Sequence, residues 1–165
     1  MSIKIRFVTG DGVFSKIIRS AQMGFWASHI ESIQSDGTYL SAYASIGVQV
    51  MAKDYDKGSG EKTIEQAHME IPCTPEQETA YWEFMKAQIG KTYDTKAIEA
   101  MAEGVFIGVE LPPNLDAGCW ICSSLHMYAF VKVGIIKICP VEARLVLPRD
   151  IFCALCSLGY PIKAS

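Results

Sequence analysis

Residues 28–44, SHIESIQSDGTYLSAYA, decide the fold prediction because they combine two apolar-polar alternating segments with a turn. SHIESIQ and TYLSAYA read as β-strands, and Ser35-Asp36-Gly37 lies between them. A loop of this length and composition suits a three-residue hairpin with glycine in the left-handed position. The stretch therefore predicts an antiparallel hairpin.

The register of this hairpin decides which polar side chains lie together. A three-residue loop pairs His29 with Tyr43 and Glu31 with Ser41, so all four side chains share one face of the sheet. A two-residue loop would shift the pairing by one residue and move Ser41 to the opposite face.

The rest of the chain is predicted to contain mostly strands first and mostly helices second. Expected strands lie at 3–7, 28–34, 38–44, 47–53 and 62–71, and KDYDKGSGEK (53–62) is expected to be a solvated, flexible loop. Expected helices lie at 13–22, 74–90, 94–105, 122–133 and 148–159. This order is typical of an α+β fold, and residues 1–165 suit a single domain.

Two helices have clear local signals. Residues 13–22 place Phe14, Ile17, Ile18 and Ala21 on one face, which we expect to be buried. Thr74 and Gln77 form a capping box around Pro75 at the first helical position. The expected buried face of that second helix is Tyr81, Phe84, Met85, Gln88 and Ile89.

Composition and charge exclude several classes of protein. The net charge is -3 and the basic residues are scattered, so we expect no nucleic-acid partner. No apolar run approaches the roughly 20 residues of a membrane span. Lys4 and Arg6 interrupt the apolar N-terminus, so we expect no signal peptide, and a cytosolic location or carriage in a phage particle. The six cysteines are then expected to be thiols.

The cysteines form two C-x-x-C pairs, Cys119 with Cys122 and Cys153 with Cys156, which is the spacing of a zinc site. The apolar residues between them do not suit a zinc knuckle, so we expect no metal or other cofactor. Cys153 and Cys156, together with Cys73 and Cys139, are expected to be small core residues. A thioredoxin-type motif would need the first cysteine at a helix start, whereas here the second cysteine occupies it.

Cys122 is therefore the candidate nucleophile. At the first turn of a helix, free backbone N-H groups favour a thiolate and can also hold an oxyanion. The alternative is a buried structural cysteine. Among the three histidines, His126 lies one turn further on the same helix and His68 is expected at the surface, so His29 is the best candidate base. Either Glu31 or Ser41 would orient its ring.

Taken in order, several stretches resemble the circularly permuted branch of the papain-like NlpC-type cysteine peptidases and amidases, whose YiiX-like members occur in bacteria and in phages or prophages. They are FSKIIRSAQMGFWASHIESIQSDGTYLSAYASIGVQV, GKTYD, CWICSSL and LPRDI, and the resemblance covers Phe14 to Ile151. It implies a permuted papain-like fold, with Cys122 as nucleophile, His29 as base and Ser41 as the third polar residue. Many relatives carry glutamate at the positions of Ser41 and Ser124.

The resemblance implies a cysteine hydrolase that cleaves an amide through an acyl-enzyme, with peptidoglycan peptides as the leading substrate and lipid esters or amides as the second. Two alternatives are a non-catalytic binding module on the same fold and a zinc-binding structural protein. Glu31, Tyr43 and Trp120 are candidate binding residues, and Trp26 and Tyr39 are further aromatic candidates for the wall of a cleft.

Overall fold

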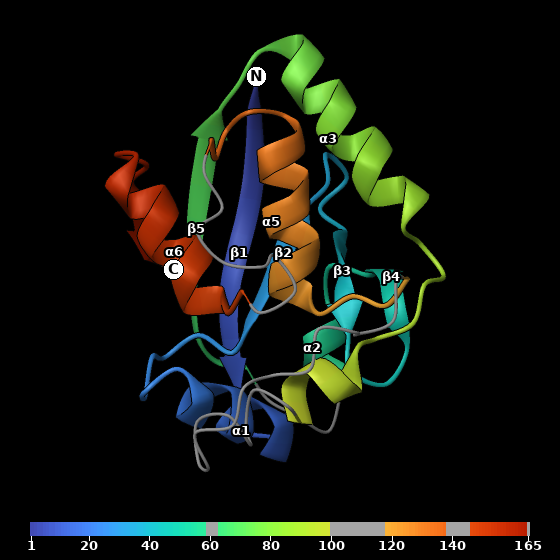
Figure 1. Ribbon diagram of the computed structural model, residues 1–165, viewed down its shortest axis with the longest axis vertical. Coiled ribbons are helices and arrows are strands. Elements are labelled where there is room, and N and C mark those ends of the chain that lie inside the picture. The colour runs from blue at the N-terminus through green and yellow to red at the C-terminus, as the bar shows by residue number, and fades with distance from the viewer. Residues whose placement is uncertain (59–62, 100–117, 138–145, 165) are drawn as a thin grey trace.

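A computed structural model describes residues 1–58, 63–99, 118–137 and 146–164 (Figure 1). The chain has an α+β fold. Within the described ranges, six strands form one sheet in the order β4-β3-β2-β1-β5-β6, and every neighbouring pair is antiparallel. The strands are β1 (Ser2–Gly10), β2 (His29–Ile33), β3 (Tyr39–Tyr43), β4 (Gly47–Met51), β5 (Thr63–Pro72) and β6 (Ile162–Ala164).

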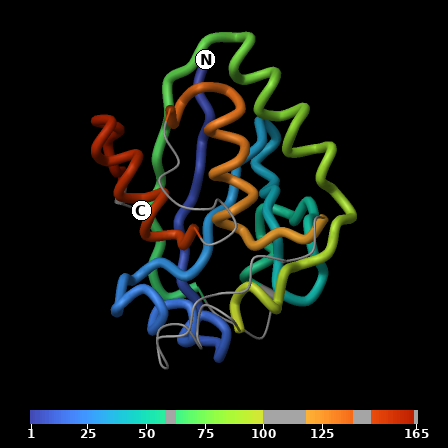
Figure 2. Tube along the Cα trace, in the orientation of Figure 1, coloured from blue at the N-terminus to red at the C-terminus, as the bar shows by residue number. Residues whose placement is uncertain are grey.

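The labelled helices are α1 (Val13–Ala21), α2 (Tyr55–Gly58), α3 (Pro75–Ala87), α5 (Cys122–Lys132) and α6 (Pro148–Ser157). Residues 95–99 are also helical. Figures 1 and 2 show α5 and α6 lying across one face of the sheet, α3 beside α5, and α1 at the end of the molecule opposite the N-terminus. No helix within the described ranges is long and apolar enough to cross a membrane.

The core lies between the sheet and α5. It contains Ile5 and Phe7 of β1, Ile30 of β2, and Leu125 and Phe130 of α5, all without exposed surface. Apolar residues alternate along β1, so one face of this central strand enters the core while the other face holds Lys4 and Arg6. Because fully burying a large apolar side chain contributes about 1.5–3 kcal/mol, this layer stabilises the contact between β1, β2 and α5.

The hairpin prediction is confirmed, and its register is confirmed for the two pairs next to the turn. Ser32 pairs with Leu40 and Ile33 with Tyr39, and Gly37 has a positive φ of 84° at the end of the three-residue loop. The backbone N-H of Gln34 donates to the carbonyl of Thr38 at 2.8 Å and closes the hairpin. Glycine is favoured at this position because a side chain would be strained there.

The helix boundaries also follow the sequence closely. The capping box of α3 is present, with Gln77 N donating to Thr74 Oγ1 at 3.2 Å and Thr74 N donating to Gln77 Oε1 at 3.0 Å. Asp94 caps the next helical segment by accepting from Ala97 N at 2.9 Å. The remainder of the predicted helix 94–105 lies outside the described residues, as does Cys139.

Three predictions about burial are corrected. Phe14 and Ile17 of α1 remain 38% and 37% exposed, whereas Ile18 and Ala21 are the buried residues of this helix. Ile89 is 44% exposed beyond the end of α3. Cys153 is exposed on the outer side of α6, so it is not a core residue.

Two elements are absent from the sequence prediction. The first part of the predicted loop 53–62 folds into the short helix α2, and the rest of that loop lies outside the described residues. The strand β6 adds to the outer edge of β5 near the C-terminus. Both are only a few residues long, so their periodicity is too short to detect.

Candidate functional site

The candidate nucleophile is the first residue of α5. Cys122 is 2% exposed and follows Ile121, whose extended backbone ends the preceding segment. Ser124 caps this end of the helix, because its Oγ accepts from Ile121 N at 3.2 Å. The first-turn amides of a helix have no partner within the helix, so this position provides N-H donors beside the sulfur.

The segment before Cys122 is held against the residues that follow α3. Trp120 N donates to Thr92 O at 3.0 Å, and Asp94 N donates to Trp120 O at 3.1 Å, which makes a parallel bridge between Tyr93 and Trp120. This bridge places side by side GKTYD and CWICSSL, two of the stretches that carry the family resemblance. The pKa of Tyr93 is raised, first by burial and second by its electrostatic interaction with Cys122, which places the two side chains near each other.

His29 is the first residue of β2 and lies opposite Val8 of β1. Its side chain is 18% exposed, and its ring centre lies 5.1 Å from that of Tyr43. The Nε2 atom is 3.6 Å from Glu31 Oε1, and this buried nitrogen has no hydrogen bond at normal distance. The two side chains share a face of the sheet because they are two residues apart on one strand.

Glu31 is fully buried and its carboxylate is surrounded by donors. Arg6 donates to Oε2 through Nε at 2.7 Å and contacts it through Nη2 at 2.6 Å. The hydroxyls of Tyr43 and Tyr55 donate to the other oxygen, Oε1, with Tyr43 at 2.9 Å. These contacts fix the carboxylate so that Oε1 faces His29.

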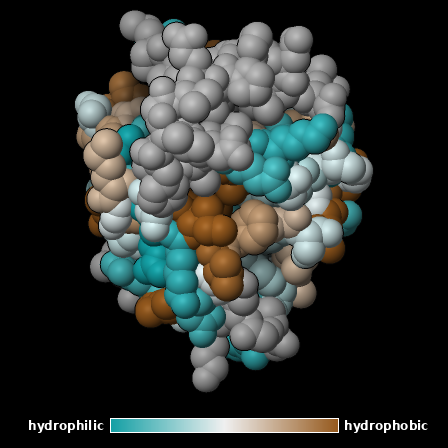
Figure 3. All heavy atoms as spheres, turned by 60° about the horizontal axis from the view of Figure 1, so that its bottom comes forward, coloured by the Kyte–Doolittle hydropathy of each residue, from teal (hydrophilic) through white to brown (hydrophobic). Residues whose placement is uncertain are grey.

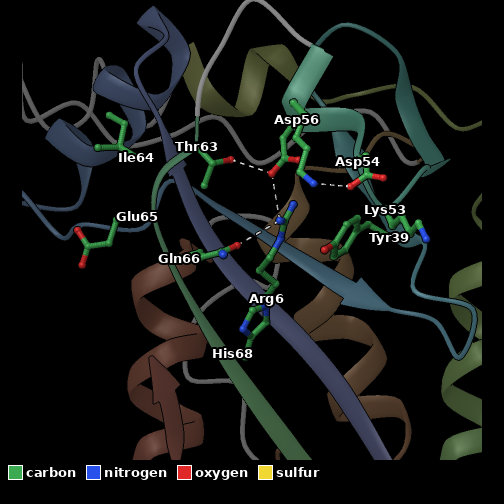
Figure 4. Close-up of a pocket in the computed structure, with 11 residues that line it drawn as sticks. Arg6, Tyr39, Lys53, Asp54, Asp56, Thr63, Ile64, Glu65, Gln66 and His68 are labelled. Carbon is green, nitrogen blue, oxygen red and sulfur yellow. Dashed lines mark hydrogen bonds and ion pairs between the residues drawn. The ribbon is translucent and has the colours of Figure 1, made fainter. Parts of the chain in front are cut away.

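Behind Glu31, the guanidinium of Arg6 is held by a second set of partners, which Figure 4 shows around it. Its Nη1 donates to Asp56 Oδ2 and to Gln66 Oε1, each at 3.2 Å. Its Cζ lies 4.0 Å from the centre of the Tyr39 ring. Arg6 is only 3% exposed, at the base of a hollow of about 560 Å³ that His68 also lines. His68 is half-buried here, whereas the sequence suggested a surface position.

The charges in this group determine the protonation of His29 and Glu31. Burial alone lowers the pKa of His29, but its electrostatic interactions with Cys122 and with the carboxylate of Glu31 outweigh burial and raise it well above its ordinary value. Burial alone raises the pKa of Glu31, but His29 and Arg6 outweigh burial and hold it well below its usual range. The arrangement therefore favours a charged imidazolium at His29 beside the ionised carboxylate of Glu31.

His126 lies on the side of β2 opposite to Glu31, and its hydrogen-bond partners are neutral. It is fully buried, with Nε2 2.9 Å from Ser32 Oγ and Nδ1 2.7 Å from the Cys122 carbonyl oxygen. Burial is the main cause that lowers the pKa of His126 to about 4; the hydrogen bond to the Cys122 carbonyl offsets part of this effect, and the charge of His29 adds to it. This histidine is consequently neutral near about pH 7.

A hollow of about 510 Å³ opens beside His29 and lies between α1 and the ends of the strands. Tyr43 and Tyr93 line it together with His29, and Phe14, Ile18, Ile46 and Met51 provide apolar walls. Among its described lining residues there is no lysine or arginine, and Asp56 is the one carboxylate. The described lining therefore offers a largely apolar approach to His29, and Cys122 is not part of that lining.

The structure brings together some of the predicted site residues and separates others. Tyr43 lies between the hollow and Glu31. Ser41 is fully buried, and its hydroxyl donates to the Ile30 carbonyl at 2.6 Å, whereas Glu31 is the carboxylate that faces His29. Glu31 itself lies behind His29 and does not line the hollow.

Trp120 was also a candidate binding residue, but it turns away from the hollow. Its Nε1 donates to Gln88 Oε1 at 3.1 Å, and its ring contacts those of Phe84 and Tyr128. Trp26, another aromatic candidate, packs in the core layer against Phe25 and Phe152, and Tyr39 stacks on Arg6.

The sequence prediction missed the contribution of Arg6, Tyr55 and Asp56. Arg6 carried one usable signal, because an arginine flanked by apolar residues in a central strand must find a buried partner. Tyr55 and Asp56 had no such signal, since they lie in a polar segment that reads as a loop.

The five cysteines within the described ranges are free thiols. Cys119 Sγ lies 3.0 Å from Thr92 Oγ1, while Cys122 is buried at the start of α5 and the second pair lies in α6. Over the ranges described above, no three histidine, cysteine or acidic side chains gather in a way that could hold a metal ion.

Comparison with known proteins places the chain in no family. No family profile matches it, and no curated protein matches it.

Proposed function

We propose that the protein is a cysteine hydrolase that cleaves an amide through a covalent acyl-enzyme, with Cys122 as nucleophile and His29 as base. The observation that carries the proposal is the placement of His29 between Cys122 and the carboxylate of Glu31, with Cys122 at the first turn of α5. A cysteine, a histidine and an orienting acid in this order form the arrangement of a thiol hydrolase.

The protonation of His29 follows from its neighbour. A carboxylate only accepts hydrogen bonds, so the Nε2 atom facing Glu31 carries the hydrogen and Nδ1 of neutral His29 holds the lone pair. His29 then takes the Cys122 proton, and the thiolate attacks the substrate carbonyl to form a tetrahedral oxyanion. First-turn amides of α5 donate to that oxyanion.

Collapse of the tetrahedral species breaks the bond to the leaving amine, which receives the proton from His29. Water then attacks the thioester as His29 accepts its proton. The acid is released and the thiol of Cys122 regains a proton. Glu31 stabilises the imidazolium in both halves of the reaction, and Arg6, Tyr43 and Tyr55 keep its carboxylate ionised and oriented.

We further propose a permuted papain-like fold of the NlpC type. The support is the order of the resembling motifs, together with a sheet that packs on the helix bearing Cys122 and a histidine that precedes the cysteine in the chain. A bacterial or phage origin, with a cytosolic location or carriage in a phage particle, belongs to the same proposal.

Peptidoglycan peptides are the substrate that the resemblance suggests first. The hollow favours a second candidate, a lipid or other acyl-chain amide or ester. Cell-wall peptides carry several carboxylates, whereas the described lining of the hollow offers no lysine or arginine to receive them. Figure 3, which looks onto the end of the molecule with α1, shows apolar side chains gathered between polar ones. Phe14 and Ile46 are 38% and 49% exposed at this hollow.

The first experiment measures the pH dependence of iodoacetamide alkylation of the native protein, with the labelled cysteine located by mass spectrometry. We expect selective labelling of Cys122 at about pH 6, where an ordinary thiol with a pKa near 8.5 is almost wholly protonated. His29→Ala should abolish this low-pH labelling, because the imidazolium that stabilises the thiolate is gone.

His68→Ala is the matched control, since His68 is also partly buried but lies in the other hollow, beside Arg6. It should leave the labelling unchanged. Slow labelling, or labelling spread over several cysteines including the exposed Cys153, contradicts the enzyme proposal and favours a non-catalytic binding module.

The two substrate classes are then compared directly. Chromogenic esters and anilides with acyl chains of increasing length are measured beside a cell-wall dipeptide amide. A rising kcat/KM with chain length, reversed by Phe14→Asp at the wall of the hollow, supports the acyl-chain substrate. A preference for the dipeptide supports the cell-wall substrate.

A further inference from the structure

Three buried hydroxyl and imidazole groups connect α3, β2 and α5 beneath Cys122. The hydroxyl of Tyr81 lies 2.6 Å from Ser32 Oγ, which lies 2.9 Å from His126 Nε2. The other ring nitrogen of His126, Nδ1, lies 2.7 Å from the carbonyl oxygen of Cys122. All three side chains are fully buried, and the hydrolytic steps above use none of them.

The direction of each hydrogen bond follows from the Cys122 carbonyl oxygen, which is the last acceptor of the series. A backbone carbonyl can only accept, so His126 Nδ1 carries the hydrogen. Burial lowers the pKa of His126 to about 4, so at higher pH the ring is neutral and Nε2 is an acceptor. Ser32 therefore donates to Nε2, and the hydroxyl of Tyr81 donates to Ser32. Each group is satisfied without a net charge.

This series of hydrogen bonds gives β2 and α5 a second point of attachment. His29 and Ser32 are three residues apart on β2, which is about 10 Å along a strand. Cys122 and His126 are four residues apart on α5, which is about 6 Å along a helix. The apolar layer between α5 and the sheet holds the helix on β2, but its contacts are not directional. The hydrogen bond between Ser32 and His126 is directional and adds a second fixed point beside the contact of His29 with Cys122.

We propose that Ser32 and His126 are positioning residues that hold Cys122 in register with His29. This inference rests on the proposed function, because it assigns them to the same thiol-imidazole pair. His126 is not a second base here, since its two ring nitrogens face Ser32 and the Cys122 carbonyl.

The test compares alkylation of Cys122 by iodoacetamide at two pH values in the full-length protein. In Ser32→Ala the rate at about pH 6 should fall at least about tenfold, because displacement of a reacting group by about 1 Å can cost up to 100-fold. At about pH 9 the rate should stay near that of the wild type, because ordinary thiols with a pKa near 8.5 are then ionised without help from a histidine.

His126→Asn and His126→Gln form a matched pair that removes the same ring. The shorter asparagine amide can replace Nδ1 and donate to the Cys122 carbonyl, but it does not reach Ser32. The longer glutamine amide reaches the position of Nε2 and can accept from Ser32. We therefore expect the low-pH loss in His126→Asn and near-wild-type labelling in His126→Gln. Tyr81→Phe removes only the outer hydroxyl and should retain the low-pH rate.

The possible results separate this inference from the proposed function. Unselective labelling of the wild type overturns the proposed function, and the positioning role with it. Selective wild-type labelling that Ser32→Ala and His126→Asn leave unchanged overturns the positioning role alone. Equal losses at both pH values in all four variants, with lowered melting temperatures, also overturn it, because they indicate general loosening of the core. If Ser32→Ala does not fold, the two His126 variants decide.

Discussion

The two faces of β2 place a histidine-bearing group on each side of one strand, and the two groups differ in charge. On one face, His29 meets Glu31, whose carboxylate is bonded to Arg6 and two tyrosines. On the other, His126 meets Ser32 and a backbone carbonyl. Both imidazoles are largely buried near Cys122, yet the pKa of His29 is raised and that of His126 is lowered. For His29, the charged partners outweigh burial and decide that the pKa is raised.

The largest effect expected from breaking this difference comes from Arg6→Met. The substitution leaves the buried carboxylate of Glu31 without its cation, which typically costs about 3–5 kcal/mol of folding free energy. Urea unfolding near about pH 7 measures the loss. Lys4→Met, on the exposed part of the same strand face, is the control and should stay within about 0.5 kcal/mol of the wild type. Equal effects of the two substitutions would contradict a charged network around Glu31.

The pH dependence of stability should separate the two histidines. The folded pKa of His126, about 4, lies below its ordinary value of 6.5, so its contribution is present above 6.5 and is lost as the pH falls toward 4. At about 1.4 kcal/mol per pKa unit, the acid loss is roughly 3 kcal/mol. Glu31, with its lowered pKa, adds a loss below its ordinary value of 4.5.

His29 acts in the opposite direction. Because its folded pKa is raised, its contribution is full below 6.5 and is lost as the pH rises above that value. Urea unfolding across this range should show a flatter acid limb for His126→Gln and a flatter alkaline limb for His29→Gln. If His126→Gln keeps the full acid slope, the neutral state of His126 is not the cause of that slope.

The same substitution on each face sharpens the comparison. Tyr55→Phe removes a donor to the charged Glu31, which should cost about 1.5–3 kcal/mol, whereas Tyr81→Phe removes a neutral hydrogen bond worth about 1 kcal/mol. Both losses are measured by urea unfolding. The reverse order would mean that the charge of Glu31 does not strengthen its hydrogen bonds.

The smallest effect distinguishes the two candidates for orienting His29. Glu31→Gln should slow alkylation of Cys122 at low pH about tenfold, equivalent to about 1.4 kcal/mol, because a neutral amide stabilises imidazolium less. Ser41→Ala should leave the rate near that of the wild type, since this hydroxyl bonds to the Ile30 carbonyl. A loss in Ser41→Ala alone would return the orienting role to Ser41.

The sequence by itself determined those features that depend on neighbours within about one turn or one hairpin. The Gly37 turn and the β2-β3 register, the Thr74 capping box and the start of α5 at Cys122 all follow from such local signals. Cys122 and His29 could be chosen as candidates because a helix start and a strand start position them independently of the remaining chain.

Only the tertiary structure decided which groups surround those two residues. Arg6 reaches Glu31 because β1 pairs with β2, and Tyr55 reaches it because α2 packs over the same face. Ser32 meets His126 only when α5 lies on the other face. These contacts join segments about 20 to 100 residues apart, and no local period encodes them. They form because a buried charge or hydroxyl must find a partner that the folded chain brings to it.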